Sequence, residues 1–270
     1  MKILITGAGG FLGQYLTKKF AHYEIHALTR QQLNLADSSA VQQHFAKATY
    51  DAVIHCGAAG RNTPTIEDWN IVSNNLSSIL NLMTHRHCFG KLINIGTGAE
   101  YDVSQDINNV SETEIFYRDP KHSYGLSKNI ISRYLAAQSN CYTLRLFGCF
   151  DSSEDDRRLL KKFHSVLNQE QKFDLQDRNF DMISAEDFYI IVDAVLNNTI
   201  QHQSINCVYA QKHRLSEILS VYCDKHGLDK SLINVTGQGL SYSGNGSTLD
   251  HYKLDLLGLE KSLANYGYNE

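Results

Sequence analysis

The sequence has little proline, no closely paired cysteines and no long apolar run. Only 2 prolines and 42% hydrophobic residues in 270 positions exclude a disordered or collagen-like chain. The six cysteines form no C-x-x-C pair, so neither a zinc site nor a disulfide framework is indicated, and we expect a reduced, cytoplasmic protein. No run approaches the roughly 18 apolar residues of a membrane span, and the apolar start is too short for a signal peptide, so no membrane association is expected.

The sequence also has no large excess of positive or negative charge. The 25 lysines and arginines stand against 29 aspartates and glutamates, a formal net charge of -4. Without a basic excess the chain lacks the means to neutralise a phosphate backbone, so nucleic acid is not expected as a partner. At roughly 150 residues per domain, the length predicts one large domain or a core with one small lobe.

Short apolar runs alternate with helical periodicity through residues 1–150, which predicts crossover-connected parallel strands. The fold class we expect is α/β, a doubly wound parallel sheet with a small C-terminal lobe that binds substrate. The core would span 1–150 and be completed by about 180–208, and the lobe would comprise 151–179 and 209–270. The expected strands are Lys2–Thr6, Glu24–Leu28, Asp51–Cys56, Lys91–Ile95, Tyr142–Phe147 and Ile205–Tyr209.

Helix boundaries can be read at several places. Ser184 and Asp187 form a capping pair before an apolar stripe, and Gly227 is expected to end a helix that starts at Leu215. The stretch His85–Cys88 could suggest metal ligands, but no second cluster completes a tetrahedral set. We interpret it as a helix end, where cations are favoured, and expect no metal. His55, on an expected strand, is interpreted as a hydrogen-bonded core histidine.

A glycine-rich turn follows the first strand directly and opens a helical pattern. Residues 6–13 read Thr-Gly-Ala-Gly-Gly-Phe-Leu-Gly. Glycine permits positive φ and close backbone approach to phosphates, while amide groups at a helix start supply hydrogen-bond donors. The turn predicts a Rossmann dinucleotide site, with an ordinary glycine-rich turn as the alternative. The residues expected against the cofactor are Gly7, Gly10, Phe11, Leu12 and Gly13.

The end of the second strand indicates which dinucleotide is bound. NAD-binding folds usually carry an acid about 20 residues after the glycine turn, which binds the ribose hydroxyls. No acid lies between Glu24 and Asp37, and Arg30 can pair with a 2′-phosphate instead. We therefore predict NADP(H), with NAD(H) as the alternative if Arg30 is only a solvated charge.

Tyr124 and Lys128 lie four residues apart, on one face of an expected helix. Tyrosine has a pKa of about 10, and a neighbouring ammonium group favours its ionised form, which suits it to proton transfer at neutral pH. Thr97 follows the expected fourth strand, at the sheet edge where open α/β folds bind ligands. The three residues predict a proton-transfer site.

Together these motifs resemble the extended short-chain dehydrogenase/reductases that act on nucleotide sugars, the NAD-dependent epimerase/dehydratase family. The resemblance covers nearly the whole chain, including the segment Phe180–Ile183. It implies that Tyr124 exchanges a proton with the sugar oxygen, Thr97 polarises that oxygen, and Tyr124 and Lys128 also contact the cofactor. Further cofactor contacts implied by the resemblance are Asn34, Leu35, Gly57, Ala58, Ala59 and Asn75.

Departures from the family pattern exclude some of the reactions that family members catalyse. The 4,6-dehydratases carry Asp and Glu where this chain has Gly98 and Ala99, and the epimerising cysteine of GDP-fucose synthase also falls on Ala99. Since alanine cannot deprotonate a carbon acid, neither dehydration nor 3,5-epimerisation is expected. The remaining reaction is NADPH-dependent reduction of the C4 keto group of a nucleotide-linked 4-keto-6-deoxy sugar, as in the dTDP-4-dehydrorhamnose reductase group. Such a reaction would serve the biosynthesis of glycan precursors. The alternatives are a C4 epimerase with tightly bound NAD and a non-catalytic dinucleotide-sensing protein.

The substrate lobe carries weaker signals. Gly148 stands where the family often has an asparagine that binds the nucleotide diphosphate, and Arg178 lies two residues before the family's usual arginine position. With Ala99, these are the expected substrate contacts, and the base stays open among GDP, dTDP, CDP and UDP. A homodimer through the helices near Leu76–Met83 and Leu126–Leu135 fits the family habit.

Overall fold

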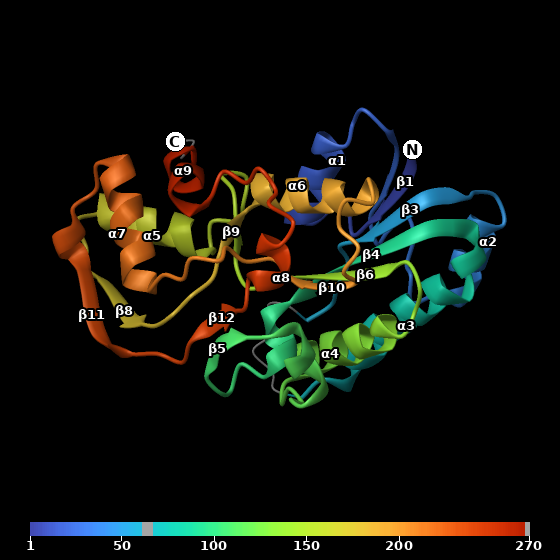
Figure 1. Ribbon diagram of the computed structural model, residues 1–270, viewed down its shortest axis with the longest axis horizontal. Helices are drawn as coiled ribbons and strands as arrows, with labels where there is room; N and C mark the ends of the chain where they lie inside the picture. The colour runs from blue at the N-terminus through green and yellow to red at the C-terminus, as the bar shows by residue number, and fades with distance from the viewer. Residues whose placement is uncertain (61–66, 268–270) are drawn as a thin grey trace. The chain divides into compact units, whose positions relative to one another are not determined.

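The computed structural model describes residues 1–60 and 67–267 (Figure 1). Residues 61–66 and 268–270, which the predicted core and lobe ranges include, lie outside the described residues. Contacts divide the chain into two units. The first comprises Met1–Ser104, Glu112–Arg145 and Val192–Ile205, and the second comprises Gln105–Ser111, Leu146–Ile191 and the chain from Asn206 on.

A six-stranded parallel Rossmann-like sheet forms the centre of the first unit, which confirms the predicted fold class. The strand order is β10-β6-β4-β3-β1-β2, so the chain starts at β1, pairs with the edge strand β2 on one side and continues through β3, β4, β6 and β10 on the other. Ile3 pairs with Ile25 on one side and with Ala52 on the other. The strands are β1 (Lys2–Thr6), β2 (Glu24–Leu28), β3 (Tyr50–His55), β4 (Phe89–Thr97), β6 (Cys141–Leu146) and β10 (Ser204–Asn206).

Four strand predictions need correction. The third and fifth strands each begin and end one residue earlier than expected. The fourth strand is longer than the apolar run Lys91–Ile95, so Thr97 is its last residue and not a residue beyond it. The last strand is Ser204–Asn206 and not Ile205–Tyr209, because the chain turns at once: the amide of Val208 donates to the carbonyl oxygen of Asn206 at 3.0 Å. Hydrophobic pattern alone does not register such a turn, since apolar residues continue past it.

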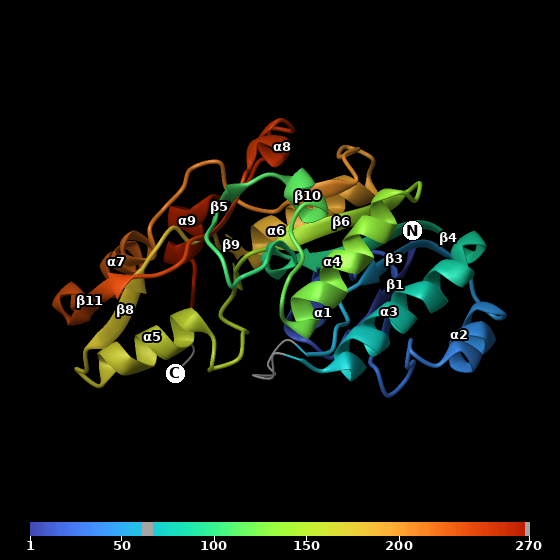
Figure 2. The same ribbon diagram turned by 90° about the horizontal axis from the view of Figure 1, so that it is seen from below.

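Helices cover both faces of this sheet. Figures 1 and 2 show α3 (Trp69–Thr84) and α4 (Ser123–Ala136) side by side on one face, with α1 (Phe11–Lys19) on the opposite face. The apolar stripes of α2 (Ser38–Phe45), α3 and α4 pack on buried strand residues in one cluster. That cluster includes Leu4, Val41, Phe45, Val53, Ile79, Leu82, Leu92, Ile131 and Leu135. Three short 3₁₀ turns complete the unit, η1 (Arg86–Cys88), η2 (Gly98–Tyr101) and η3 (Glu112–Phe116).

The second unit consists of short elements around its own core. The amide of Asp187 donates to the Ser184 hydroxyl at 3.1 Å, and Gly227 has φ +66 at the end of α7, so both predicted helix boundaries are confirmed. Phe163, Leu219, Tyr222 and Leu263 lie in the core of this unit. Its elements are β5 (Ile107–Val110), β7 (Cys149–Phe150), α5 (Leu159–Asn168), β8 (Phe173–Asp177), β9 (Ile183–Ser184), the start of α6 (Ala185–Leu196), α7 (Leu215–His226), η4 (Lys230–Leu232), β11 (Ile233–Gln238), β12 (Tyr242–Gly244), α8 (Ser247–Asp250) and α9 (Leu259–Ala264).

Several smaller expectations can be compared with the structure. His85 is the residue at which α3 ends, which confirms the helix-end interpretation of that stretch. All six cysteines lie among the described residues and are free thiols. Within the described ranges, none of the helices combines the length and apolar character that crossing a bilayer requires. That the second unit binds the nucleotide sugar stays a prediction.

Candidate active site

The glycine turn between β1 and α1 has no room for side chains at two positions. Gly7 has φ +71, and a Cβ there would lie 2.5 Å from the amide nitrogen of Gly57. A Cβ on Gly13 would run into the carbonyl oxygen of Gly7. The amide of Gly10 donates to the Gly7 carbonyl at 3.1 Å, which closes the turn at the start of α1. The turn thus packs directly on the loop after β3, as a backbone cradle for phosphates requires.

A cavity of about 320 Å³ opens between this turn, the ends of β2 and β3, and helix α3. It fits the predicted cofactor site, because most of the residues expected there line it. Those residues are Gly7, Gly10, Arg30, Asn34, Leu35, Gly57, Ala58, Ala59 and Asn75. Phe11, Leu12 and Gly13 belong to α1 and are not among the lining residues, and neither are Tyr124 and Lys128. The role of each of these residues in cofactor binding stays a prediction.

The cavity also includes residues that the sequence pattern did not single out. Thr29 precedes Arg30 at the end of β2, and Ser78 lies one helical turn after Asn74 on α3. The i, i+4 spacing from Asn74 was the signal available for Ser78. The Thr29 amide donates to the Gln32 side chain at 2.9 Å, which ends β2 and leaves Arg30 exposed at the cavity. No carboxylate occurs among the described residues that line the cavity.

Asn75 fastens the cavity wall to the neighbouring helix. Its side-chain oxygen accepts from the Ala59 amide at 2.7 Å, and its nitrogen donates to the Ala59 carbonyl at 3.2 Å. The same nitrogen donates to the Ser127 hydroxyl on α4 at 2.9 Å. A buried side chain that satisfies both backbone groups of one residue fixes that residue firmly. The loop after β3 is therefore held in a fixed position relative to α4.

Two polar side chains at the cavity floor stay uncharged. His55 is buried, and its Nδ1 shares a hydrogen bond of 2.8 Å with the Thr6 hydroxyl, which confirms its interpretation as a core histidine. Burial, assisted by the positive charge of Lys128, lowers the pKa of His55 to about 3. Burial likewise raises the pKa of the Cys56 thiol to about 12, although Lys128 opposes this shift. Neither side chain is suited to act as a base at neutral pH.

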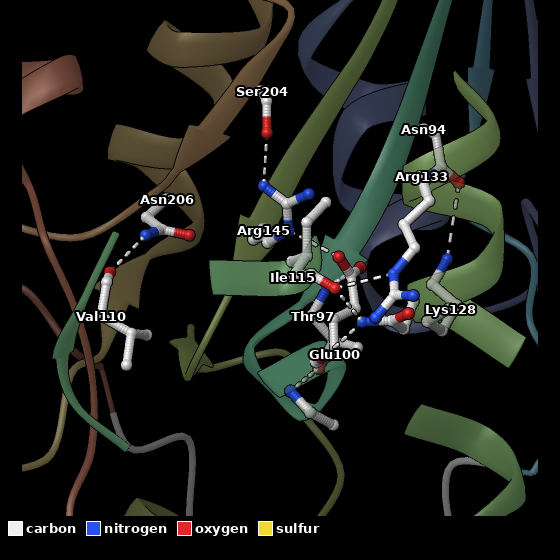
Figure 3. Close-up of polar contacts among 12 residues, drawn as sticks. Asn94, Thr97, Glu100, Val110, Ile115, Lys128, Arg133, Arg145, Ser204 and Asn206 are labelled. Carbon is white, nitrogen blue, oxygen red and sulfur yellow. Dashed lines mark hydrogen bonds and ion pairs between the residues drawn. The ribbon is translucent and has the colours of Figure 1, made fainter. Parts of the chain in front are cut away.

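Helix α4 carries Tyr124 in its first turn and Lys128 one turn later. The His122 ring accepts from the Gly125 amide at 3.0 Å, which caps the helix start. Lys128 is 2% exposed, and its ammonium group donates to the Ile95 carbonyl at 2.7 Å and to the Asn94 side chain at 3.4 Å (Figure 3). The ammonium group thus reaches the carboxyl end of β4. Desolvation lowers the pKa of Lys128, and the carboxylate of Glu100 opposes that shift.

The turn after β4 is fastened to the same helix. The Thr97 hydroxyl accepts from the Ala99 amide at 3.2 Å and so caps η2. A Cβ on Gly125 would lie 2.5 Å from the Ala99 carbonyl oxygen, so α4 starts in direct contact with this turn. Asn129 extends that contact, since its side-chain nitrogen donates to the Glu100 carbonyl at 2.8 Å. The structure thereby brings the turn that begins at Thr97 against the helix that bears Tyr124 and Lys128.

The three expected substrate contacts do not share one unit. Ala99 is buried in η2 of the first unit, whereas Gly148 and Arg178 belong to the second. A Cβ on Gly148 would lie 2.9 Å from the Met182 Cβ, so this position has no room for the asparagine of the family pattern. The Arg178 guanidinium lies 5.5 Å from the centre of the Phe180 ring, and its Nε has no partner among the described residues. Substrate contact by these residues stays a prediction.

Comparisons with known proteins agree with this architecture. The model of the family "NAD dependent epimerase/dehydratase family" matches residues 3–208. The chain is 24% identical to a GDP-6-deoxy-D-talose 4-dehydrogenase of Aggregatibacter actinomycetemcomitans, over 83% of this chain and 80% of that protein. It is 42% identical to the spore coat polysaccharide biosynthesis protein SpsK of Bacillus subtilis over 59 residues, which is 21% of each chain.

A solved structure shares the fold over the whole length. A dTDP-4-dehydrorhamnose reductase from Clostridium acetobutylicum superimposes with a TM-score of 0.83 at 19% identity, and the match covers 98% of each chain. At this identity the likeness concerns the fold.

Proposed function

Since the chain belongs to the NAD dependent epimerase/dehydratase family, and so is an NAD(P)-dependent enzyme, we propose that it reduces the C4 keto group of a nucleotide-linked sugar with NADPH. The substrate class is a 4-keto-6-deoxy sugar, and the product is a precursor for glycan biosynthesis. The observation that carries this proposal is the contact between the turn that begins at Thr97 and α4, the helix that bears Tyr124 and Lys128. The likeness of the chain to a GDP-6-deoxy-D-talose 4-dehydrogenase and to a dTDP-4-dehydrorhamnose reductase supports it.

The reaction needs one hydride and one proton at the same carbonyl group. Reduced nicotinamide, when bound, supplies the hydride to the carbonyl carbon. Tyr124 donates its phenolic proton to the carbonyl oxygen, so that ketone becomes alcohol and tyrosine becomes tyrosinate. Lys128, one helical turn further along α4, stabilises that tyrosinate with its positive charge. The Thr97 hydroxyl accepts from Ala99, which leaves its own hydrogen to donate to the substrate oxygen.

The absence of an acid or base at Ala99 limits the chemistry to C4. Ala99 is 8% exposed and carries a methyl group where an epimerising residue would stand. We expect a panel of nucleotide-linked 4-keto-6-deoxy sugars, offered with NADPH, to include one that is consumed with one equivalent of NADPH. In deuterated water the product should carry no deuterium on carbon at C3 or C5, by mass spectrometry. Deuterium at either carbon would contradict reduction without epimerisation, and the absence of NADPH consumption across the panel would contradict the reductase.

The same preparation separates the alternative activities. A C4 epimerase would release NAD on denaturation and would interconvert two sugars without consuming added NADPH. A dinucleotide sensor would bind NADPH and turn over no sugar.

A homodimer through α3 and α4, where Leu80, Ile130 and Tyr134 are exposed, is part of the proposal.

NADPH preference is expected to depend on Arg30. Its guanidinium lies at the cavity without a carboxylate among the described lining residues, and can pair with a 2′-phosphate. Replacement Arg30→Ala should weaken NADPH binding about tenfold or more and leave NADH binding nearly unchanged, because only NADPH carries that phosphate. Cofactor fluorescence titration measures both affinities. Lys47→Ala, which removes a cation that does not line the cavity, is the matched control, and equal losses for both cofactors would contradict the assignment.

A further inference from the structure

A buried carboxylate lies directly behind Thr97. Glu100 is 0% exposed, and its Oε1 accepts from the Thr97 amide at 2.9 Å (Figure 3). Its Oε2 lies 2.5 Å from the Nε of Arg145, which is buried to the same extent. The Thr97 hydroxyl and the Glu100 carboxylate thus cap η2 reciprocally, and the carboxylate ties that turn to β6.

The sheet makes room for this ion pair. A Cβ on Gly96 would lie 2.7 Å from the Glu100 Oε1 and 2.9 Å from the Arg145 Cγ. Arg145 also donates to the Ser204 hydroxyl at 2.6 Å and lies 5.7 Å from the centre of the Tyr101 ring. Desolvation largely offsets the attraction within a buried pair, so the attraction between the two charges adds little to the stability of the fold. Stability therefore does not account for an ion pair at this position.

The charge of Glu100 acts on Lys128 as well. Two cations, Lys128 and Arg145, are buried in the first unit, and the Glu100 carboxylate pairs with Arg145 and acts on Lys128 through its charge. Arg145 adds to the desolvation that lowers the pKa of Lys128, whereas Glu100 counteracts both. Of the other groups near Lys128, His55 and Cys56 stay uncharged, while Tyr101 and Glu112 act on Arg145. Loss of the Glu100 charge would leave Lys128 next to a buried cation with little compensation.

We propose that Glu100 is a positioning residue of the active site, which orients Thr97 through its amide and preserves the positive charge of Lys128 beside Tyr124. This inference rests on the proposed reductase function. Glu100 acts through the backbone amide of Thr97 and through the charge of Lys128. Its two effects can be separated, because one depends on a hydrogen-bond acceptor and the other on a charge.

Three variants separate these effects. Glu100→Gln keeps an oxygen acceptor for the Thr97 amide and removes the charge. The double variant Glu100→Leu with Arg145→Met removes the acceptor and both charges, while an apolar pair replaces the ion pair. Glu114→Gln is the matched control, since Glu114 forms a surface ion pair with Arg118 at 3.2 Å. Each is measured for NADPH affinity, for kcat and KM, and for the pH profile of alcohol oxidation by the reverse reaction.

The single variant tests the charge. In the oxidation direction Tyr124 must be ionised, so the rate rises with pH through its pKa. Glu100→Gln removes a negative charge that disfavours the tyrosinate, so that rising limb should move about one pH unit downward. Because Lys128 then holds its proton less strongly, the plateau of the limb should fall. We expect kcat at neutral pH to fall about tenfold, with NADPH affinity within about threefold of wild type.

The double variant tests the orientation of Thr97. Because it removes the opposing effects of Glu100 and Arg145 on Lys128 together, its rising limb should return towards the wild-type pH. Its kcat should stay about a hundredfold low, since the Thr97 amide has lost its acceptor. Full recovery of kcat in the double variant, or an unshifted limb in Glu100→Gln, would overturn the inference. If the wild-type protein turns over no 4-keto sugar, the proposed function fails instead, which the wild-type assay reveals before any variant is compared.

Discussion

Replacement of Tyr124 by phenylalanine is expected to lower kcat for 4-keto sugar reduction about a thousandfold and to leave NADPH binding within about twofold of wild type. Phenylalanine keeps the ring and removes only the hydroxyl group, so the first turn of α4 and its contact with Ala99 should persist. What is lost is the proton that the carbonyl oxygen needs as hydride arrives. Steady-state kinetics and cofactor fluorescence titration measure the two quantities separately.

A second tyrosine on the same helix provides the control. Tyr134 lies near the end of α4 and is 36% exposed, so Tyr134→Phe removes an equivalent hydroxyl group far along the helix. Its turnover should match wild type. A Tyr124→Phe variant that kept more than about a tenth of wild-type kcat would contradict a proton-donor role, because general acid catalysis contributes at least about a hundredfold. If Tyr124→Phe matched the wild-type protein in every assay, the dinucleotide-sensing alternative would be favoured instead.

Replacement of Gly7 by alanine is expected to abolish measurable NADPH binding and to lower the free energy of unfolding by about 2 kcal/mol. Gly7 has φ +71, a conformation that alanine adopts only with strain, and its new methyl group would meet the backbone of Gly57 at 2.5 Å. Neither backbone segment can yield by a side-chain rotation. The loop after β3 would therefore move away from the turn, and the cavity that both segments line would lose its shape.

Gly9→Ala is the matched control for stability. It lies two residues further in the same turn, and a Cβ there would make only an ordinary contact of 3.5 Å with the Thr29 side chain. Denaturant unfolding should give nearly wild-type stability for Gly9→Ala and a clear loss for Gly7→Ala. Retention of NADPH affinity within about threefold in Gly7→Ala would refute the assignment of this turn to the dinucleotide.

Much of the fold and part of the site were predictable because they depend on local pattern. Alternating apolar runs and helical stripes determine the sheet with helices on both faces, since each such segment has one way to bury its apolar side. The position of the glycine turn between strand and helix follows from residues 6–13 alone, and the i, i+4 spacing of Tyr124 and Lys128 puts them on one helix face. Even the helix boundaries at Ser184 and Gly227 follow from local capping chemistry.

The tertiary structure decided what depends on residues far apart in the chain. That Gly125 touches Ala99, that Asn75 joins Ala59 to Ser127, and that Glu100 is buried with a counter-ion 45 residues away are contacts no local pattern contains. A glutamate in a turn is exposed in most proteins, and no local pattern marks Glu100 as buried. Only the packing of β4, α4 and β6 removes it from water, and burial is what makes its charge felt by Lys128.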